Sequence, residues 1–250
     1  MTCGRETFFL ADSHLRGPAD ENQPVMIRFL EEHASSTSTL VVVGDMFDFM
    51  AGYNRAVIEA YRPVLDALSL WPDIHFFEGN HDFDLSPRMP GLRGARLWTR
   101  PSTIRVSGRD VRVLHGDRAS PSDIGTRLLR MALQSTSMRF IRDHILPDGL
   151  VFRFALAFAT MSRRNTWPGR GNEEHHARLR AISEAVGAGT DMVVFAHTHK
   201  SILMRLDDIT VANPGAAVDG GSFLFLKDNI MRLRRFPDGE TLDPGPLEIN

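Results

Sequence analysis

Short apolar segments alternate with amphipathic segments along most of the chain, and this alternation limits the fold more than any other feature of the sequence. The apolar segments are rich in β-branched and aromatic residues, as buried strands are. The strands expected from this pattern are residues 7–11, 40–43, 74–77, 111–114 and 192–196. Because strands that alternate with helices are joined by crossover connections, the pattern predicts an α/β fold with a largely parallel sheet covered by helices.

The amphipathic segments between these strands predict the helices. Apolar residues recur at helical spacing in residues 25–30, 57–68 and 173–186. After His199 the pattern changes to closely spaced strand-like segments, separated by turn-forming Asp, Asn, Pro and Gly residues. The segments that we expect to form antiparallel hairpins are residues 202–206, 209–212, 222–226 and 230–236.

Residues 118–172 and 237–250 follow neither pattern. The first stretch contains two helical-looking segments, 124–146 and 150–164, so we expect a helical cap inserted in the α/β core. The second stretch is rich in Pro, Gly and acidic residues and is expected to be loosely ordered. Residues 1–250 are therefore interpreted as one domain that includes the cap.

Composition excludes several classes of protein. The 250 residues carry a formal net charge of −2, which provides no global positive field for nucleic acid. The single cysteine, Cys3, cannot form an internal disulfide or a cysteine-rich zinc site. The apolar segment at residues 8–11 is too short for a signal-peptide core, and no stretch approaches the roughly 20 apolar residues that span a bilayer. We therefore expect a cytoplasmic protein, with any membrane contact at its surface.

Polar side chains follow each of the predicted buried strands. In open α/β sheets, ligands collect beyond the carboxyl ends of the strands, so these tips should lie around one crevice. Asp, Asn and His without thiolates suit hard or borderline divalent ions, with manganese as our first choice and iron or zinc as alternatives. The side chains at the tips are Asp12, His14, Asp45, Asp48, Asn80, His81, Asp82, His115, Asp117, His197 and His199.

Each tip also has an ordinary structural explanation. An Asp after a strand often begins a helix or a turn, and a lone His-x-His is often a chance surface pair. Metal-ligand residues at the end of every predicted buried strand make a metal site the better interpretation. Asp45 has two carboxylate oxygens and could bridge two ions about 3.5–4 Å apart, which is the arrangement that cleaves phosphoesters.

The order of these motifs resembles the calcineurin-like metallophosphoesterase signature. The motifs are Asp-x-His at 12–14, Gly-Asp-x-x-Asp at 44–48, Gly-Asn-His-Asp at 79–82, His-Gly-Asp at 115–117 and His-x-His at 197–199. The resemblance implies a two-sheet α/β sandwich that binds two divalent ions. It implies that one ion is held by Asp12, His14, Asp45 and His199, and the other by Asp45, Asn80, His115 and His197. A departure is Ala196, which stands where the family usually has Gly.

The same resemblance implies hydrolysis by a metal-bridging hydroxide that attacks phosphorus in line. His81 lies beside the expected ligand Asn80 and could donate a hydrogen bond or a proton to the leaving oxygen, and the alternative is a histidine that only packs. Asp48 and Asp82 are expected to hold ligand imidazoles in one tautomer. Asp48 could equally be a turn residue.

The expected cap is both basic and apolar. Residues 127–164 contain seven arginines and two aspartates among many large apolar residues. This composition is typical of an interfacial membrane-binding helix pair or of an acyl-chain pocket with phosphate-holding arginines. Two helices that pack on the core with a solvated basic face explain it equally well.

A further set of residues resembles the UDP-2,3-diacylglucosamine diphosphatases, peripheral enzymes of the inner membrane in lipid A synthesis. The set is Ser-Asp-x-Gly at 122–125 and Ser-Arg-Arg-Asn at 162–165, on either side of the basic apolar helices. The resemblance implies cleavage of the pyrophosphate of a UDP-linked diacyl sugar into UMP and acyl-sugar 1-phosphate. Arg163, Arg164 and Asn165 are then the expected substrate-binding residues. His81 and Asp48 depart from that family, whose best-established members carry Arg and Glu there.

Two alternatives to this substrate stay open. One is a metallophosphoesterase of other specificity, acting on a nucleotide phosphodiester, a diadenosine polyphosphate or a phosphoprotein. The other is a scaffold protein that kept the fold and lost its metals, although none of the expected ligands is missing from the sequence. Nucleic acid is not an expected partner, because the basic residues gather on an apolar segment rather than among groove-lining aromatics.

Overall fold

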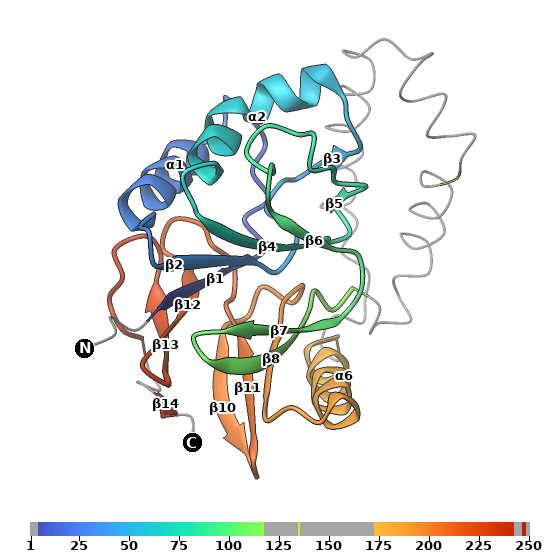
Figure 1. The fold of residues 1–250 in the computed structure, drawn as a ribbon, viewed down its shortest axis with the longest axis vertical. Coiled ribbons are helices and arrows are strands. Elements are labelled where there is room, and N and C mark those ends of the chain that lie inside the picture. The colour runs from blue at the N-terminus through green and yellow to red at the C-terminus, as the bar shows by residue number, and fades with distance from the viewer. Residues whose placement is uncertain (1–4, 118–134, 136–172, 243–246, 249–250) are drawn as a thin grey trace.

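The computed structural model describes residues 5–117, 135, 173–242 and 247–248 (Figure 1). The expected cap at 118–172 therefore lies outside the described residues, apart from Ser135. Within the described residues, no helix is long and apolar enough to cross a membrane.

The larger of the two main sheets has the strand order β14-β13-β12-β1-β2-β4-β6. β1, β2, β4 and β6 run parallel to one another, and β12, β13 and β14 extend the sheet from β1 in antiparallel fashion. The strands are β1 (Glu6–Leu10), β2 (Ser38–Val42), β4 (Asp73–Phe77), β6 (Arg96–Trp98), β12 (Ser222–Lys227), β13 (Ile230–Arg235) and β14 (Leu247–Glu248).

The smaller main sheet has the order β10-β11-β9-β8-β7. Its three central strands are parallel, and the strand at each edge is antiparallel to its neighbour. The strands are β7 (Ser102–Val106), β8 (Arg109–Leu114), β9 (Met192–Phe195), β10 (Ile202–Leu206) and β11 (Ile209–Asn213). A separate short pair joins β3 (Met50–Ala51) to β5 (Asp82–Phe83).

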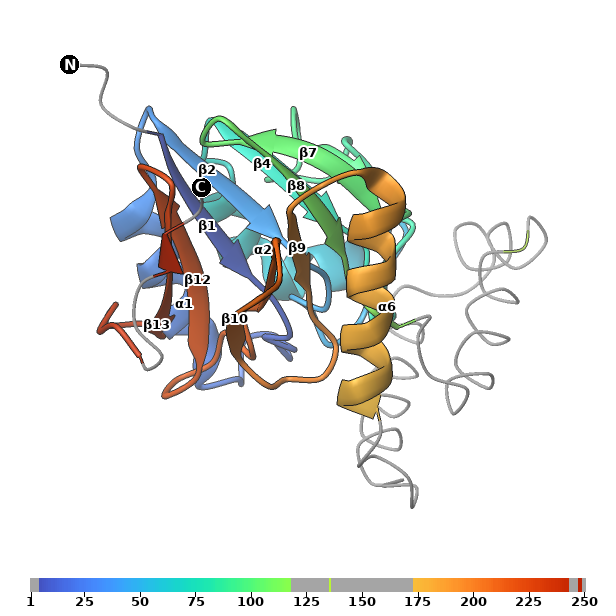
Figure 2. The same cartoon turned by 90° about the horizontal axis from the view of Figure 1, so that it is seen from below.

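The two main sheets pack face to face between helices, which gives a four-layer sandwich. α1 (Asn22–His33) and α2 (Arg55–Leu68) cover the outer face of the larger sheet, and α6 (Glu173–Ala188) covers the outer face of the smaller one (Figures 1 and 2). α6 contacts β8, β9 and β11. The expected two-sheet α/β sandwich is confirmed.

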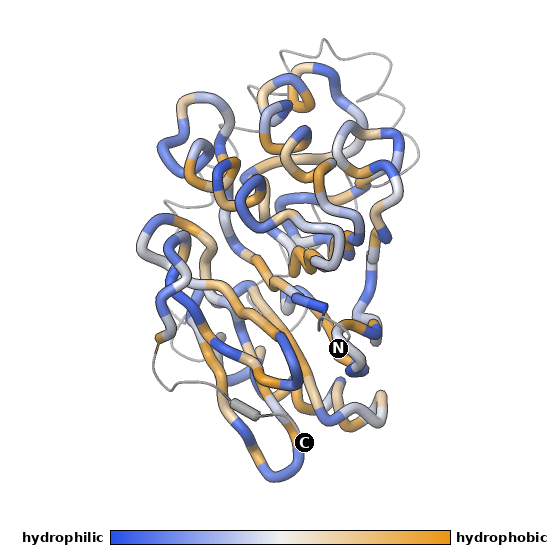
Figure 3. The backbone as a smooth tube through the Cα atoms, turned by 60° about the vertical axis from the view of Figure 1, so that its left-hand side comes forward, coloured by the Kyte–Doolittle hydropathy of each residue, from blue (hydrophilic) through white to orange (hydrophobic). Residues whose placement is uncertain are grey.

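The alternation of side chains along each central strand builds three separate hydrophobic layers. In β1, Phe8 and Leu10 point into the layer under α1 and α2, whereas Phe9 points into the layer between the sheets. In β9, Val194 enters the layer between the sheets, and Phe195 enters the third layer, under α6. Both faces of these strands are therefore buried, which explains why they are mostly apolar. Figure 3 shows hydrophobic stretches of the described chain in orange, interrupted by hydrophilic stretches in blue.

The sequence interpretation is right for the central strands and incomplete at the edges. The hairpins expected after His199 form as β10–β11 and β12–β13, but they belong to different sheets, and β11 also pairs in parallel with β9. The five predicted buried strands pair in parallel as expected, but they are divided between the two sheets, with β1, β2 and β4 in the larger one and β8 and β9 in the smaller one. Of the tail expected to be loosely ordered, residues 247–248 pair with β13 as β14.

Candidate metal centre

The carboxyl ends of strands from both sheets meet at one edge of the sandwich. The segments after β1 and β2 continue side by side beyond their strands, because Asp12 N donates to Gly44 O at 3.1 Å and His14 N donates to Asp45 O at 3.0 Å. A hydrogen bond also joins the segment after β9 of the smaller sheet to this edge, because His197 N donates to the Asp12 carboxylate at 2.9 Å. The side chains expected at the strand tips are thus brought together from distant parts of the sequence.

The backbone of this edge is strained at the ligand positions themselves. Left-handed φ angles are uncommon for residues other than glycine and cost of order 1–3 kcal/mol each, so they persist only where the surrounding structure enforces them. They are found at Asp12 (52°), His14 (44°), Asp45 (55°), His197 (75°) and His199 (58°). Strain concentrated on the predicted metal ligands supports a functional role for this edge.

Two glycines let these loops approach closely. A Cβ on Gly79 would collide with the Asp45 carboxylate and with the backbone N of Asp45. A Cβ on Gly44 would lie 2.5 Å from Nδ1 of His115, and Gly44 also has a left-handed φ of 90°. Each glycine therefore leaves room for the side chain of an expected ligand.

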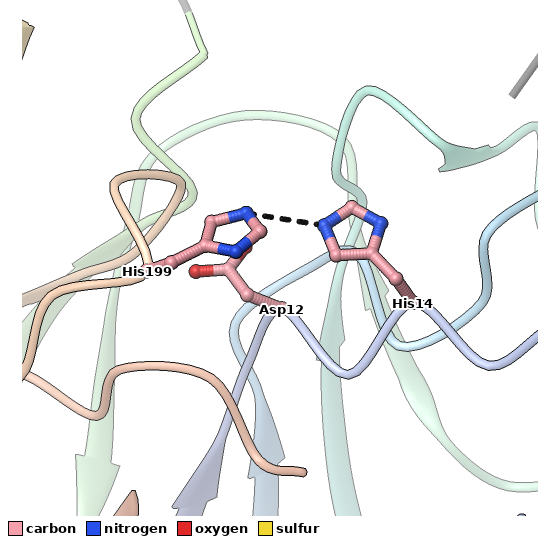
Figure 4. A group of neighbouring side chains, drawn as sticks. All are labelled: Asp12, His14 and His199. Atoms are coloured by element: carbon pink, nitrogen blue, oxygen red, sulfur yellow. Dashed lines mark hydrogen bonds between the residues drawn. The ribbon is translucent and has the colours of Figure 1, made fainter. Parts of the chain in front are cut away.

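Asp12, His14 and His199 form the first group of potential ligands (Figure 4). Nε2 of His14 and Nε2 of His199 lie 3.3 Å apart and face each other. Oδ1 of Asp12 is buried and has no hydrogen-bond partner among the described residues. Two facing ring nitrogens and an unpartnered carboxylate oxygen are what a cation binding among them would satisfy.

Asp45, His115 and His197 form the second group. Nδ1 of His115 lies 2.8 Å from Val43 O, and because a carbonyl can only accept, that nitrogen carries the proton. The lone pair on Nε2 of neutral His115 then faces Oδ2 of Asp45 and Oδ1 of Asn80, each at 3.2 Å. A cation between this nitrogen and the two oxygens would remove their repulsion.

The Asp45 carboxylate belongs to both sides of the site. Its Oδ1 accepts from the backbone N of His81 at 2.9 Å. Its Oδ2 lies 3.2 Å from Nε2 of His115 and 3.8 Å from Nε2 of His14, which are members of the two different groups. This position between the groups is the one that a bridging ligand needs.

The electrostatics of the metal-free site show how strongly it attracts positive charge. Burial opposes ionisation of Asp45, but His115, His81 and His14 hold the pKa of its carboxyl well below the ordinary value. Burial likewise opposes protonation of His115, but the charges of Asp45 and Asp12 raise its pKa well above 6.5. In the absence of metal, the carboxylates of the site therefore favour a proton on His115, where a divalent ion would otherwise supply the positive charge. The residues present therefore fit a pair of divalent ions, and the clusters are consistent with a dinuclear site.

His81 lies against the first ligand group. Its Nδ1 lies 2.8 Å from Asp48 O, so this nitrogen donates and Nε2 is left without the proton when the ring is neutral. The ring packs edge-on against His14, with centroids 4.7 Å apart. His81 also forms a potential ligand group with His14 and Asp45, so its assignment as a proton donor rather than a ligand stays a prediction.

The two additional aspartates differ in what they contact. Oδ1 of Asp48 lies 3.6 Å from Nδ1 of His14, consistent with the expectation that it orients a ligand imidazole. Asp82 instead accepts from the backbone N of Asp45, Met46 and Gly79, at 2.9, 2.8 and 2.9 Å. The expectation that Asp82 orients an imidazole is wrong, because its carboxylate is occupied by the backbone of the two ligand loops. Burial and the nearby Asp45 carboxylate raise the pKa of Asp82 to about 7.

Three further features of the expected site have different outcomes. The expected substrate-binding residues Arg163, Arg164 and Asn165 fall outside the described residues. The sequence interpretation overlooked the carbonyl of Val43, because a backbone group leaves no signature in residue type. Ala196 is completely buried in the layer between the sheets, so its methyl group is accommodated.

Comparison with known proteins agrees with this geometry. The chain is 26% identical to a UDP-2,3-diacylglucosamine hydrolase of Aeromonas salmonicida over 78% of the chain and 77% of that protein. It is 25% identical to the enzyme of the same name from Coxiella burnetii, strain Dugway, over 93% of the chain and 98% of that protein. A crystal structure of a Vps29 single mutant from Entamoeba histolytica shares the fold, with a TM-score of 0.51 and 14% identity over 98% of this chain and 99% of that one.

The chain also matches the sequence model of a whole protein family. The model of the calcineurin-like phosphoesterases matches residues 7–201. That span contains every residue of both ligand groups. The chain therefore belongs to the calcineurin-like phosphoesterase family, and it is a metallophosphoesterase with His and Asp clusters typical of dinuclear phosphohydrolases.

Proposed function

We propose that this enzyme hydrolyses the pyrophosphate of a UDP-linked diacyl sugar, giving UMP and an acyl-sugar 1-phosphate. The observation that carries this proposal is the match to UDP-2,3-diacylglucosamine hydrolases, which reaches 93% of the chain and 98% of the relative. A match over 93% of the chain must include most of residues 118–172 as well as the metallophosphoesterase core. The basic and apolar composition of that stretch suits an anionic lipid substrate.

In this proposal Asp12, His14, Asp45 and His199 hold one divalent ion, and Asp45, Asn80, His115 and His197 hold the other. The ions, manganese by preference and iron or zinc as alternatives, supply a water of lowered pKa and neutralise charge on the phosphoryl oxygens. The chain contributes the geometry, since strained loops and close glycine contacts hold the ligands in place.

His81 serves as the proton donor to the leaving oxygen. Its Nδ1 proton is used by Asp48 O, so Nε2 is the atom that would carry and release the transferred proton. The side chain is 15% exposed, which leaves it accessible from the solvent side of the site. Asp48 assists by orienting His14.

The cap supplies the substrate specificity in this proposal. Arg163, Arg164 and Asn165 bind the phosphates, since arginine offers a planar bidentate fork and these residues close the apolar segment. An acyl-binding cap would also bring the enzyme to the cytoplasmic surface of the inner membrane.

A second candidate is a phosphoesterase of other specificity, for a nucleotide phosphodiester, a diadenosine polyphosphate or a phosphoprotein. It is favoured by His81 and Asp48, which depart from the Arg and Glu expected of a typical diacylglucosamine enzyme. Assay of these substrates beside the UDP-linked lipid separates the candidates. The second candidate replaces the first if a non-lipid substrate is cleaved and the lipid is not.

The arginine proposal is tested with the double variant Arg163→Ala/Arg164→Ala. Loss of a charge-assisted phosphate contact costs roughly 1.5–3 kcal/mol, so cleavage of UDP-2,3-diacylglucosamine should fall by about tenfold or more. Bis(4-nitrophenyl) phosphate, which is too small to need the cap, should be cleaved at the wild-type rate. Arg62→Ala, at a partly exposed arginine of α2, is the matched control. Equal losses on both substrates would show that the two arginines only support the fold.

A further inference from the structure

Asn213 lies beneath the loop that carries two of the proposed metal ligands. β11 is between β9 and β10 in the smaller sheet, so the 196–201 loop from β9 to β10 passes over the carboxyl end of β11. Asn213 is the last residue of β11 and pairs with Ile202, the first residue of β10. The middle of the loop is Thr198, flanked by His197 and His199.

The Asn213 side chain is completely buried and bridges this loop to the turn that follows β11. Its Oδ1 accepts from the backbone N of Gly215 at 2.8 Å. Because a backbone N–H can only donate, the amide orientation follows, and Nδ2 donates to Oγ1 of Thr198 at 3.1 Å. The donor on Asn213 therefore reaches the one residue that separates the two histidines.

The turn beneath Asn213 has little freedom to move. Ser222 Oγ donates to Pro214 O at 2.6 Å, and a Cβ on Gly215 would lie 2.5 Å from that same Oγ. Ala217 N donates to Ala11 O at 2.9 Å, so the turn is also attached to the residue before Asp12. Asn213 thus stands on a support that is fixed relative to the first ligand group.

The loop above Asn213 needs such a support. His197 and His199 both have left-handed φ angles, 75° and 58°, which are costly for residues with side chains. His199 is exposed and stacks only loosely on the ring of His14, with centroids 5.0 Å apart, so the core of the protein does not hold its ring in place. A hydrogen bond at Thr198 fixes the backbone between the two histidines and so fixes the direction in which both rings point.

We infer that Asn213 is a positioning residue for the metal centre, acting through Thr198 on His199 and His197. This inference rests on the dinuclear site of the proposed function. It assigns Asn213 no contact with substrate or with metal. Partners of this kind, which orient ligands without binding the ion, typically change metal affinity by 10–100-fold when removed.

The direct test is a calorimetric titration of metal-free protein with Mn²⁺, with thermal unfolding measured on the same samples. Thr198→Val keeps the shape of Thr198 and removes only the hydroxyl, so at least one Mn²⁺ should bind about 10–100-fold more weakly. Thr198→Ser keeps the hydroxyl and should bind Mn²⁺ with the affinity of wild type. Thr190→Val is the control, because it removes a hydroxyl from the loop before β9.

Asn213→Ala should weaken the binding of the same Mn²⁺ ion. The double variant Asn213→Ala/Thr198→Val should bind Mn²⁺ no more weakly than the single variant that binds it more weakly. Such non-additivity is expected only if the two side chains act as one unit. If wild type binds two ions and Thr198→Val binds both with wild-type affinity, the inference is overturned, even if Asn213→Ala unfolds at a lower temperature. If wild type itself binds fewer than two ions, it is the proposed function that fails.

Discussion

His81 is the site residue for which structure and chemistry allow two distinct roles. As a proton donor it is needed for turnover and not for metal binding. His81→Ala should then keep both ions while turnover of an aryl phosphodiester falls by on the order of 10²–10⁴. Metal content by mass spectrometry and initial rates should be compared with His176→Ala, at an exposed histidine of α6. Loss of an ion in His81→Ala would instead make His81 a ligand.

His75 predicts a pH dependence that is unrelated to the metal centre. Its ring is buried between two donors, since Nδ1 lies 3.3 Å from Trp98 Nε1 and Nε2 lies 2.7 Å from Nη1 of Arg96, and neither partner can accept. Burial lowers the pKa of His75 below 6.5, and the Arg96 charge lowers it further, although Asp73 opposes this. The folded protein therefore prefers the neutral ring, whereas the unfolded chain binds a proton below about pH 6.5.

The sign of the effect follows from linkage. The stability contributed by neutral His75 is complete above the unfolded pKa and is lost as pH falls from about 6.5 toward the folded pKa. His75→Gln cannot titrate and should lose less stability than wild type between about pH 7 and pH 5. Urea unfolding midpoints across this range measure the difference. Parallel curves for the two proteins would show that His75 does not contribute to the slope.

At the scale of secondary-structure elements, the contact between the β2 and β4 loops depends on Gly79. A methyl group there would collide with Asp45, and displacement of a ligand by about 1 Å can cost about 10²-fold in rate. Gly79→Ala should therefore lower turnover by such a factor and should also lower metal content, because the displaced carboxylate is an expected ligand. Gly187→Ala, on α6 with open space around its Cβ position, should leave both unchanged. Full metal content and activity in Gly79→Ala would contradict the close packing of these loops.

The strands that stand out most clearly in the sequence are the central ones, which face two hydrophobic layers. β1, β2, β4, β8 and β9 each end in a mostly apolar, largely buried segment, and the ligands follow these ends. The short strands β3, β5 and β6 were not predicted, since two or three residues cannot show a period. The five-residue β7 alternates in burial and could have been found from its Ser-Thr-Ile-Arg-Val sequence.

The sequence was enough to predict which residues form the site, but it was less informative about the contacts that they make. Asp45 could be assigned a bridging role because it has two oxygens, and the structure places one of them between His115 and His14. The backbone-binding role of Asp82 could not be foreseen, since it depends on how two loops approach each other. Asn213 was overlooked for the same reason, since its contact with Thr198 depends on how the β10–β11 hairpin folds back beneath the loop.

At the scale of the whole molecule, the metal centre joins the two sheets. Asp12, Asp45 and Asn80 follow strands of the larger sheet, and His115 and His197 follow strands of the smaller one. Ligands from both sheets assemble only when the sandwich has formed, so the unfolded chain lacks the site. Binding of divalent ions should therefore also stabilise the folded chain by mass action.

The measurement that tests the account most directly is Mn²⁺ binding by metal-free protein, followed by calorimetry, with cleavage of bis(4-nitrophenyl) phosphate assayed in the same samples. Wild type should bind two ions per chain, and activity should reach its plateau only as the second ion binds. Asp45→Ala should bind Mn²⁺ more weakly and should lack activity, because one carboxylate serves both ions. Asp66→Ala, at an exposed carboxylate of α2, should match wild type. Near wild-type turnover in Asp45→Ala, or full activity of wild type with a single ion, would contradict the dinuclear centre.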